Sequence, residues 1–177
     1  QYIAGEKLSK LTTNYPKGHP LYASSSDEDL EDLAKVKIDD LKKFYADFYG
    51  ANNSFSAFVG ELDKNTITPF LQKIFGGWNS KSPFARIAQR HFEVKGTTET
   101  VNTPDKTNAM LLGGININIS EKHVDYPAIF MANELLGGGA FLSSRIPQRL
   151  RENEGMSYGA GSYMNTNYKD DVTNWGV

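Results

Sequence analysis

Segments with a helical apolar period alternate along this chain with segments that have the composition of β-strands. This alternation constrains the fold more than any other feature. In DDLKKFYADFYG, apolar side chains recur at helical spacing, and Leu41, Phe44, Tyr45 and Phe48 share one face. The next stretch, SFSAFVGEL, has the aromatic and β-branched content of a strand. The sequence therefore predicts an α+β fold.

Residues at the segment ends predict where the helices of the first half begin and end. Asp39 can cap the helix of residues 39–49, and Gly50 stands where a left-handed residue is expected after a helix. In ITPFLQKIFGGW, Thr68 can act as the cap with Pro69 in the first turn. SSSDEDLED, further upstream, is typical of the solvated start of a short helix.

The middle of the chain predicts a linker followed by strands. Residues 79–89 are polar and irregular, and we interpret them as a linker between two units. HFEVKGTTETVN then alternates like a hairpin turning at Lys95 and Gly96. AMLLGGININI is the most apolar run and predicts a buried strand, where Gly113 and Gly114 suggest a bulge or a close backbone approach.

Two helices with clear start and stop residues, and two strands, are predicted toward the C-terminus. DYPAIFMANELLGGG has Asp125 as a cap candidate and Pro127 in its first turn. SSRIPQRLRENEG begins at Ser143 or Ser144 and ends at Gly155. The side chains predicted to point inward from the first helix are Ile129, Met131, Ala132, Leu135 and Leu136. MSYGAGSYMNT and DDVTNWGV read as strands.

Composition excludes several classes of function. The net charge of −2 comes without a basic block, which argues against nucleic-acid binding. No apolar run approaches the ~18 residues of a membrane span, and the absence of cysteine excludes disulfides and thiolate metal sites. The chain begins without Met and ends in a strand-like segment, so we expect a piece of a longer polypeptide.

The triple glycine at residues 137–139 does not have the pattern of a phosphate-binding loop. A Walker A loop needs GxxxxGK[ST], and GGGAFLSS contains no lysine and follows a helix instead of a strand. A dinucleotide fingerprint also fails, because no GxGxxG opens a helix after a strand. The glycines are expected to form a joint between two helices.

The histidines do not form a catalytic metal motif. None of His19, His91 and His123 lies in an HxxEH pattern, whereas catalytic zinc usually takes three protein ligands and a water. The stretch EKHVD does bring Glu121, His123 and Asp125 close in sequence. Because it precedes a helix cap, we interpret it as ordinary surface polarity.

The stretch RENEGMSYG carries the best candidate site. A purely structural role would explain this stretch. Arg149 and Arg151 suit the negative end of a helix, and Gly155 ends that helix. Arg151 and Tyr158 also flank the turn, so a guanidinium and a phenol could converge. Such donors could serve a peptide carbonyl or a developing oxyanion. The residues alone leave both readings open.

Several segments together resemble the pitrilysin/insulinase-like zinc metallopeptidases, also called the M16 family or inverzincins. These segments are DKTNAML, DYPAIFMANELLGGG, SSRIPQRLRENEGMSYGAGS and, upstream, DDLKKFYADFYGANNSFSAFVGELD with a helix ending in FGGW. The resemblance covers nearly the whole chain and is most specific over residues 125–161. It implies helices packed on a mainly antiparallel sheet, as in the LuxS/mitochondrial-processing-peptidase-like metallohydrolases. It also implies module boundaries: residues 1–78 end one module, 79–89 link, and 90–177 begin the next.

The resemblance also implies a function. In this family zinc is held by HxxEH and a downstream glutamate in an early module, and a later module supplies an arginine and a tyrosine seven residues apart. By resemblance these are Arg151 and Tyr158, which would contact the substrate backbone and the tetrahedral intermediate. Because HxxEH is absent, we expect a carboxyl-side, non-zinc fragment that is inactive alone and carries no cofactor.

The expected partners are a peptide substrate and a missing amino-terminal half, or a partner subunit, that carries the zinc. A non-catalytic homologue, acting as a structural or peptide-binding subunit, is the alternative, and a stand-alone peptide-binding module is a further one. An exported bacterial protein, periplasmic or secreted, is favoured for the parent by resemblance alone.

Overall fold

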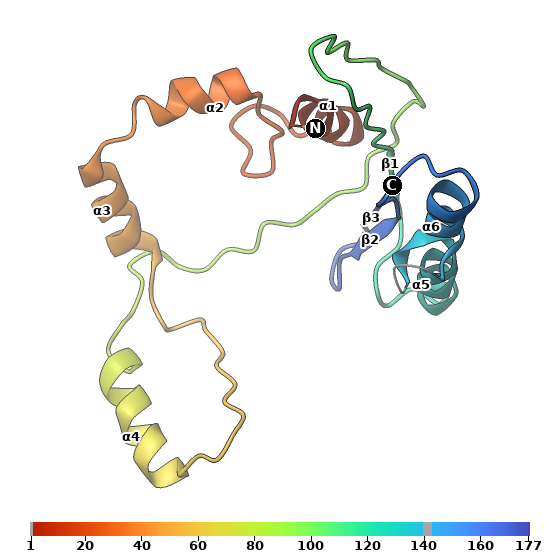
Figure 1. Cartoon of the computed structure of the whole chain (residues 1–177). Coiled ribbons are helices and arrows are strands. Elements are labelled where there is room, and N and C mark those ends of the chain that lie inside the picture. The colour runs from red at the N-terminus through yellow and green to blue at the C-terminus, as the bar shows by residue number, and fades with distance from the viewer. Residues whose placement is uncertain (1, 140–142) are drawn as a thin grey trace. The chain divides into compact units, whose positions relative to one another are not determined.

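The computed structural model describes residues 2–139 and 143–177 (Figure 1), and it confirms the α+β class. The helices are α1 (Tyr2–Thr12), α2 (Ser26–Leu33), α3 (Ile38–Phe48), α4 (Lys64–Phe75), α5 (Tyr126–Asn133) and α6 (Arg145–Pro147). Two π-helical segments, η1 (Glu134–Gly138) and η2 (Gln148–Asn153), continue α5 and α6. The strands are β1 (Gly114–Ile117), β2 (Tyr163–Thr166) and β3 (Thr173–Gly176).

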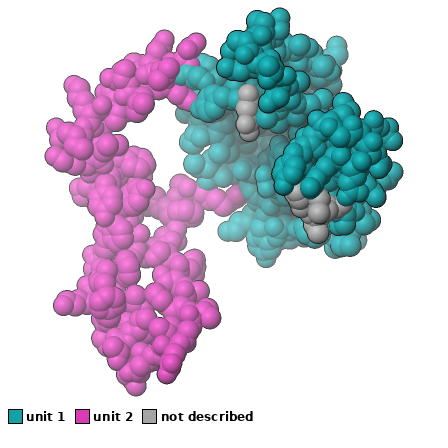
Figure 2. Space-filling view, viewed as in Figure 1, with its two compact units in different colours: residues 1–26, 87–177 teal, residues 27–86 magenta. Residues whose placement is uncertain are grey.

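The chain divides into two compact units, shown in Figure 2. Unit 1 comprises residues 1–26 and 87–177, and unit 2 comprises residues 27–86. These boundaries differ from those of the predicted modules 1–78 and 90–177. Residues 79–89 contain no helix or strand, and their role as a linker between two modules stays a prediction.

Unit 1 contains a three-stranded antiparallel sheet in the order β1-β3-β2, as predicted for the sheet type. The last strand of the chain is central, with Trp175 opposite Ile115 of β1 and Met164 of β2. Gly113 and Val177 exchange backbone hydrogen bonds of 3.0 and 2.9 Å, which extends the β1–β3 ladder by one pair. The predicted strand DDVTNWGV is thereby confirmed.

Helix α1 lies against β1, an outer strand of this sheet, in residues for which the sequence analysis predicted no helix or strand. The Asn116 side chain of β1 donates to the Thr12 carbonyl at 2.5 Å, and the Leu8 side chain lies against Gly114. Ala4, Leu8 and Leu11 are half-buried at helical spacing. That short apolar row is the signal that could have predicted α1.

Helix α5 begins as predicted, but it turns a different face inward. Asp125 is the N-cap and Pro127 lies in the first turn. The buried residue of the helix is the polar Asn133, at 6% exposure, whereas Met131 and Leu135 are exposed at 56% and 65%. The prediction that the apolar side chains point inward is therefore wrong for most of them. The described sheet offers Asn133 hydrogen-bond donors, while no described element covers the apolar side.

The helix formed by α6 and η2 also begins and ends as predicted. Ser144 is its N-cap, and Gly155 follows it with φ +62°. Because a left-handed φ costs a residue with a Cβ roughly 1–2 kcal/mol, glycine is the natural residue there. Residues 140–142, the centre of the GGGAFLSS stretch, lie outside the described residues.

Helix α3 of unit 2 forms where expected, but both predicted end residues are wrong. The N-cap is Lys37, whose N–H donates to the Asp40 carboxylate at 2.9 Å, so Asp39 lies inside the first turn. Gly50 does not adopt a left-handed φ. A Cβ at Gly50 would instead collide with the backbone nitrogen of Ser80. Glycine is needed at position 50 because the backbone of Ser80 approaches it closely, and not because the turn requires a left-handed φ.

Helix α4 begins earlier than predicted, because Asp63 is a better cap than Thr68. The Asp63 carboxylate accepts from the Asn65 N–H at 2.9 Å and from the Thr66 hydroxyl at 2.7 Å. Pro69 therefore lies inside the helix and not in its first turn. The prediction of a cap at Thr68 is therefore wrong. It relied on the preference of proline for the first turn of a helix, and that preference does not apply to Pro69.

Two predicted strand regions do not form strands. Residues 54–62 and the predicted hairpin at 91–102 contain neither helix nor strand. The predicted strands at 109–119 and 156–166 are shortened to β1 and β2. A strand is completed only by a hydrogen-bonded neighbour, and composition does not show whether the chain contains one.

Candidate functional site

The structure places Arg151 and Tyr158, the two predicted site residues, in direct contact. The guanidinium carbon of Arg151, in η2, lies 4.7 Å from the centre of the Tyr158 ring. This is a cation–π contact, worth about 0.5–1 kcal/mol at an exposed site. Tyr158 is 78% exposed, so the ring remains accessible to a ligand.

The turn between the two residues folds the chain back toward the helix. After Gly155, the N–H groups of Met156 and Ser157 both donate to the Leu150 carbonyl, at 2.8 and 3.4 Å. The turn thus satisfies a carbonyl at the helix end. Tyr158 is brought back over η2 as a result.

A strand over this stretch was predicted and is not observed. Residues 155–162 contain no strand, and β2 starts only at Tyr163. The Ser157 hydroxyl donates to the Gly159 carbonyl at 2.8 Å, a local bond typical of a turn. Tyr158 is therefore placed by a turn and not by the alternation of a strand.

A charged pair and a hollow accompany the site. Arg149 of η2 forms an ion pair with Glu154 at 2.5 Å, across the turn that leads to Gly155. A hollow of about 600 Å³ lies along α6 and η2, and its polar lining includes Arg145, Arg149 and Asn153. Polar and cationic groups therefore lie on the same helix as Arg151.

A buried polar cluster connects the helices of unit 1 to its sheet, and the sequence analysis missed it. The Asn133 side-chain oxygen accepts from the Ser162 hydroxyl at 2.8 Å and from the Trp175 indole N–H at 2.9 Å. Ser162 precedes β2 and Trp175 lies in β3. The available signal was a single amide at the end of the otherwise apolar helix YPAIFMAN.

The residues of this chain do not fit a catalytic zinc ion. No HxxEH occurs in the sequence, and no group of three or more His, Cys, Asp or Glu residues is arranged for a metal within residues 2–139 and 143–177. In EKHVD, His123 Nδ1 accepts from the Asp125 N–H at 3.2 Å. This local turn agrees with the interpretation of EKHVD as surface polarity.

The triple glycine lies at the end of a helix. Gly137 and Gly138 close η1, and the Gly139 N–H donates to the Glu134 carbonyl at 3.0 Å. A Cβ at Gly137 would meet the backbone of Ser162, so η1 approaches the chain before β2 closely.

Among the described residues, no helix is long and apolar enough to cross a membrane.

Comparisons with known proteins agree with this picture. The family model "Peptidase M16 inactive domain" matches residues 35–177. A protein of Bacillus subtilis (strain 168), named "Uncharacterized zinc protease YmxG", is 25% identical over 169 residues, which covers 95% of this chain and 38% of that protein.

A solved structure has the same fold. The crystal structure of a peptidase M16 inactive domain from Pseudomonas fluorescens matches with a TM-score of 0.65 and 23% identity, over 99% of this chain and 41% of that one. The chain thus spans about two fifths of the length of these relatives. Because the family model matches most of its residues, the chain belongs to the peptidase M16 inactive-domain family.

Proposed function

We propose that this chain is the non-zinc part of a larger zinc metalloendopeptidase, and that Arg151 and Tyr158 contact the backbone of the peptide being hydrolysed. The observation that carries the proposal is the contact between the two side chains. The guanidinium lies over an exposed phenol ring, at 4.7 Å. A cation and a phenol held together at the surface suit a polar, extended ligand such as a peptide.

The zinc would belong elsewhere in the parent. This chain lacks HxxEH, and its relative YmxG, named a zinc protease, is much longer than the matched region. Zinc supplies a bound water of lowered pKa and polarises the peptide carbonyl. An amino-terminal half or a partner subunit would supply these groups, while the present chain would shape the substrate chamber.

Arg151 and Tyr158 have a defined chemical task in this arrangement. The guanidinium and the phenol O–H donate hydrogen bonds, and a peptide carbonyl oxygen accepts them. Donors aimed at that oxygen become more valuable as it gains negative charge in the tetrahedral intermediate. Loss of one such donor typically lowers kcat by about 10²–10³.

The test is substitution in the intact parent protein. Arg151→Ala and Tyr158→Phe are expected to lower the kcat of peptide hydrolysis by about 10²-fold, with zinc content unchanged. Tyr168→Phe is a matched control, because Tyr168 is 59% exposed and also carries a cation, the Lys122 ammonium, at 4.6 Å. The control is expected to retain the wild-type rate.

A wild-type rate in both site variants would overturn the assignment of Arg151 and Tyr158. An equal loss in the Tyr168→Phe control would show a general surface effect instead. The 177-residue chain alone is expected to show no zinc-dependent peptidase activity, because it lacks the zinc ligands.

The alternative is a non-catalytic homologue that acts as a structural or peptide-binding subunit. The absence of a metal-ligand group among residues 2–139 and 143–177 fits this alternative as well as it fits the first proposal. Reading the upstream sequence of the parent for HxxEH and a distal glutamate decides between the two. Peptide binding by the 177-residue chain alone would favour the binding-module version.

We also propose that the parent works outside the bacterial cytoplasm, in the periplasm or as a secreted protein. This proposal rests on the family resemblance. Cell fractionation with an antibody against the chain tests it, and recovery of the parent only in the cytoplasmic fraction would contradict it.

A further inference from the structure

The segment 156–162, which carries Tyr158, contains no helix or strand and is fixed to the helices of unit 1 at both ends. At its beginning, the N–H groups of Met156 and Ser157 donate to the Leu150 carbonyl of η2, at 2.8 and 3.4 Å. Tyr158 follows directly, and its side chain is 78% exposed. A side chain that is so exposed gains little from packing, so the backbone on either side of it mainly decides where the ring lies.

The other end of the segment is held by a buried hydrogen bond to α5. The Ser162 hydroxyl donates to the Asn133 side-chain oxygen at 2.8 Å, and the two residues are 9% and 6% exposed. Because a buried hydroxyl group without an acceptor is costly, this bond holds Ser162 against the end of α5. The chain is thereby anchored four residues after Tyr158.

Two glycines let the same part of the segment lie directly on η1. A Cβ at Gly137 would lie 2.5 Å from the Ser162 backbone nitrogen, and a Cβ at Gly161 would lie 2.8 Å from the Gly137 carbonyl oxygen. Both distances are too short for a real side chain, so backbone meets backbone at this point. Backbones that are packed so closely leave the segment little room to slide along η1.

We propose that Asn133 is a positioning residue for Tyr158. Through Ser162 it fixes the far end of the segment that holds the Tyr158 ring over the Arg151 guanidinium, and the close contact with η1 assists. The inference deepens the proposed function and rests on it for the effect on catalysis. The geometric effect, on the 4.7 Å contact between ring and guanidinium, can be tested separately.

A second hydrogen bond to the same oxygen separates this role from general stability. The Asn133 side-chain oxygen also accepts from the Trp175 indole N–H at 2.9 Å. Trp175 lies in β3, the central strand, whereas Ser162 belongs to the segment that carries Tyr158. Removal of either donor disturbs the same buried atom, but only removal of the Ser162 hydroxyl releases the segment. A purely structural role of Asn133 would make the two losses equivalent.

Nuclear magnetic resonance of the parent protein, with labelled arginine, measures the ring contact directly. Protons of the Arg151 side chain that lie over the Tyr158 ring resonate upfield, and Tyr158→Leu defines their position without the ring. Ser162→Ala is expected to lose most of this upfield shift, because the far end of the segment is released. Trp175→Phe is the matched control and is expected to retain nearly all of it.

Variants of Asn133 itself complete the comparison. Asn133→Ala removes the acceptor and should lose the ring contact, as Ser162→Ala does. Asn133→Asp keeps an acceptor oxygen in a side chain of nearly the same shape and should retain the contact.

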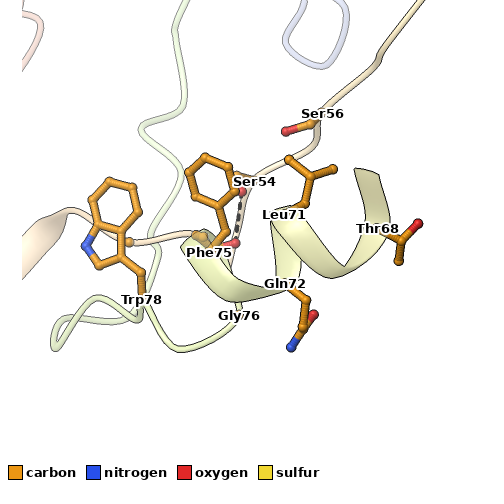
Figure 3. Close-up of a pocket in the computed structure, with 10 residues that line it drawn as sticks. Ser54, Ser56, Thr68, Leu71, Gln72, Phe75, Gly76 and Trp78 are labelled. Atoms are coloured by element: carbon orange, nitrogen blue, oxygen red, sulfur yellow. Dashed lines mark hydrogen bonds between the residues drawn. The ribbon is translucent and has the colours of Figure 1, made fainter. Parts of the chain in front are cut away.

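Two further variants check the interpretation. Gly137→Ala adds a Cβ at the contact with the segment and removes no hydrogen-bonding group, so it should also weaken the ring contact. Ser54→Ala is a control for the substitution in Ser162→Ala. The Ser54 hydroxyl also donates a hydrogen bond, to the Ala51 carbonyl at 2.9 Å, but it lies beside α4 in unit 2 (Figure 3). This control should leave the ring contact unchanged.

Peptide turnover by the parent supplies the second readout. Ser162→Ala should lower kcat by about 10-fold with KM little changed, against about 10²-fold for Tyr158→Phe, because a misplaced donor serves the transition state poorly. In a Tyr158→Phe background, Ser162→Ala should change kcat by less than about 2-fold, because the hydroxyl group that it positions is already absent. A loss of folded protein alone would lower the rate by the same factor in both backgrounds.

The proposal is overturned if Ser162→Ala keeps the wild-type ring contact, or if Trp175→Phe loses as much of it as Ser162→Ala. Loss in the first variant with retention in the second supports it. If Asn133→Ala or Gly137→Ala does not fold, this pair of variants decides alone. A wild-type rate for Tyr158→Phe rejects the catalytic role of Tyr158, and the resonances still decide whether Asn133 positions the ring.

Discussion

The two units of this chain differ in whether they contain the partners that their own strands and apolar side chains need. Unit 1 pairs its strands within the chain and buries a hydrogen-bonded amide, Asn133, at 6% exposure. Unit 2 forms well-capped helices but leaves their aromatic faces uncovered, with Phe44 at 55% and Phe48 at 58%. The difference teaches that helices form from local signals, whereas their apolar faces require a partner that these 60 residues do not contain.

The largest difference is expected from two asparagines that make similar hydrogen bonds. Asn133→Ala removes the acceptor of Ser162 and Trp175 in a buried site, and Asn52→Ala removes the acceptor of Ser80 at an exposed site. Unsatisfied buried donors cost about 1–3 kcal/mol each, so Asn133→Ala should destabilise unit 1 by about 2–4 kcal/mol. Asn52→Ala should cost less than about 0.5 kcal/mol.

Denaturant unfolding can separate these two effects, because each unit contains one of the two tryptophans. Trp175 reports on unit 1 and Trp78 on unit 2, and each can be followed after replacing the other with phenylalanine. A similar loss of stability for both asparagine variants would show that the contrast in burial has no energetic meaning.

A smaller effect is expected from two glycines that are needed for different reasons. Gly155 has φ +62° and open space around its Cβ position, whereas Gly50 has no left-handed φ but no space beside Ser80. Gly155→Ala should cost about 1–2 kcal/mol, and Gly155→Asn less, since asparagine tolerates this conformation. Gly50→Asn should destabilise the protein at least as much as Gly50→Ala, because each substitution adds a Cβ where there is no space for one.

Thermal melts of the four variants check this, with Gly159→Ala as the control. Gly159 has neither a left-handed φ nor a neighbour within 4 Å of its Cβ position, so the control should melt like the wild type. Equal losses for Gly155→Ala and Gly155→Asn would contradict the backbone explanation. For Gly155, the distance between Arg151 and Tyr158, followed by nuclear Overhauser effects, should change along with stability.

The smallest effect is a pH dependence of unit 2. A hydrogen bond from the Thr66 hydroxyl, followed by one from the Asn65 N–H, lowers the pKa of Asp63 below its ordinary value of 3.8. A carboxyl group with a lowered pKa contributes stability above its ordinary pKa and loses it as pH falls through the lower, folded value. Helix α4 should therefore fray in acid, below about pH 4.

Circular dichroism of the wild type and Asp63→Asn measures this effect. Asparagine keeps the capping oxygen but does not titrate, so the variant should show a weaker acid-induced loss of helicity. Asp47 should retain its own contribution in both proteins, because the pKa of this carboxyl is lowered mainly by the hydrogen bond from Lys43. Identical acid profiles would exclude Asp63 as the source.

The ends of several helices and the contact between Arg151 and Tyr158 could be predicted because their signals are local. The start of α5 at Asp125, the end of η2 at Gly155 and the convergence of Arg151 with Tyr158 each depend on residues within one or two turns. The caps predicted at Asp39 and Thr68 lie instead at Lys37 and Asp63, because several polar residues near each helix start compete for the cap position.

Strand pairing and burial could not be predicted, because they depend on distant residues. FSAFV and EVKGTTETV have strand composition but no described neighbour strand, and Met131 of an apolar helix stays exposed while Asn133 is buried. A single sequence does not say which residues face a sheet, and still less whether that sheet belongs to another part of the parent.

The π-helical geometry of η2 has a consequence for comparing sequences in this family. Its Glu154 N–H donates to the Arg149 carbonyl, five residues back, so this turn holds more residues than an α-turn. Deleting one residue of this turn ahead of Arg151 would convert it to an ordinary α-turn, and the spacing from Arg151 to Tyr158 would stay intact. Alignments of distant relatives should therefore be anchored on the glycine after the helix and counted backward, because a gap inside the helix is structurally tolerable and one after Arg151 is not.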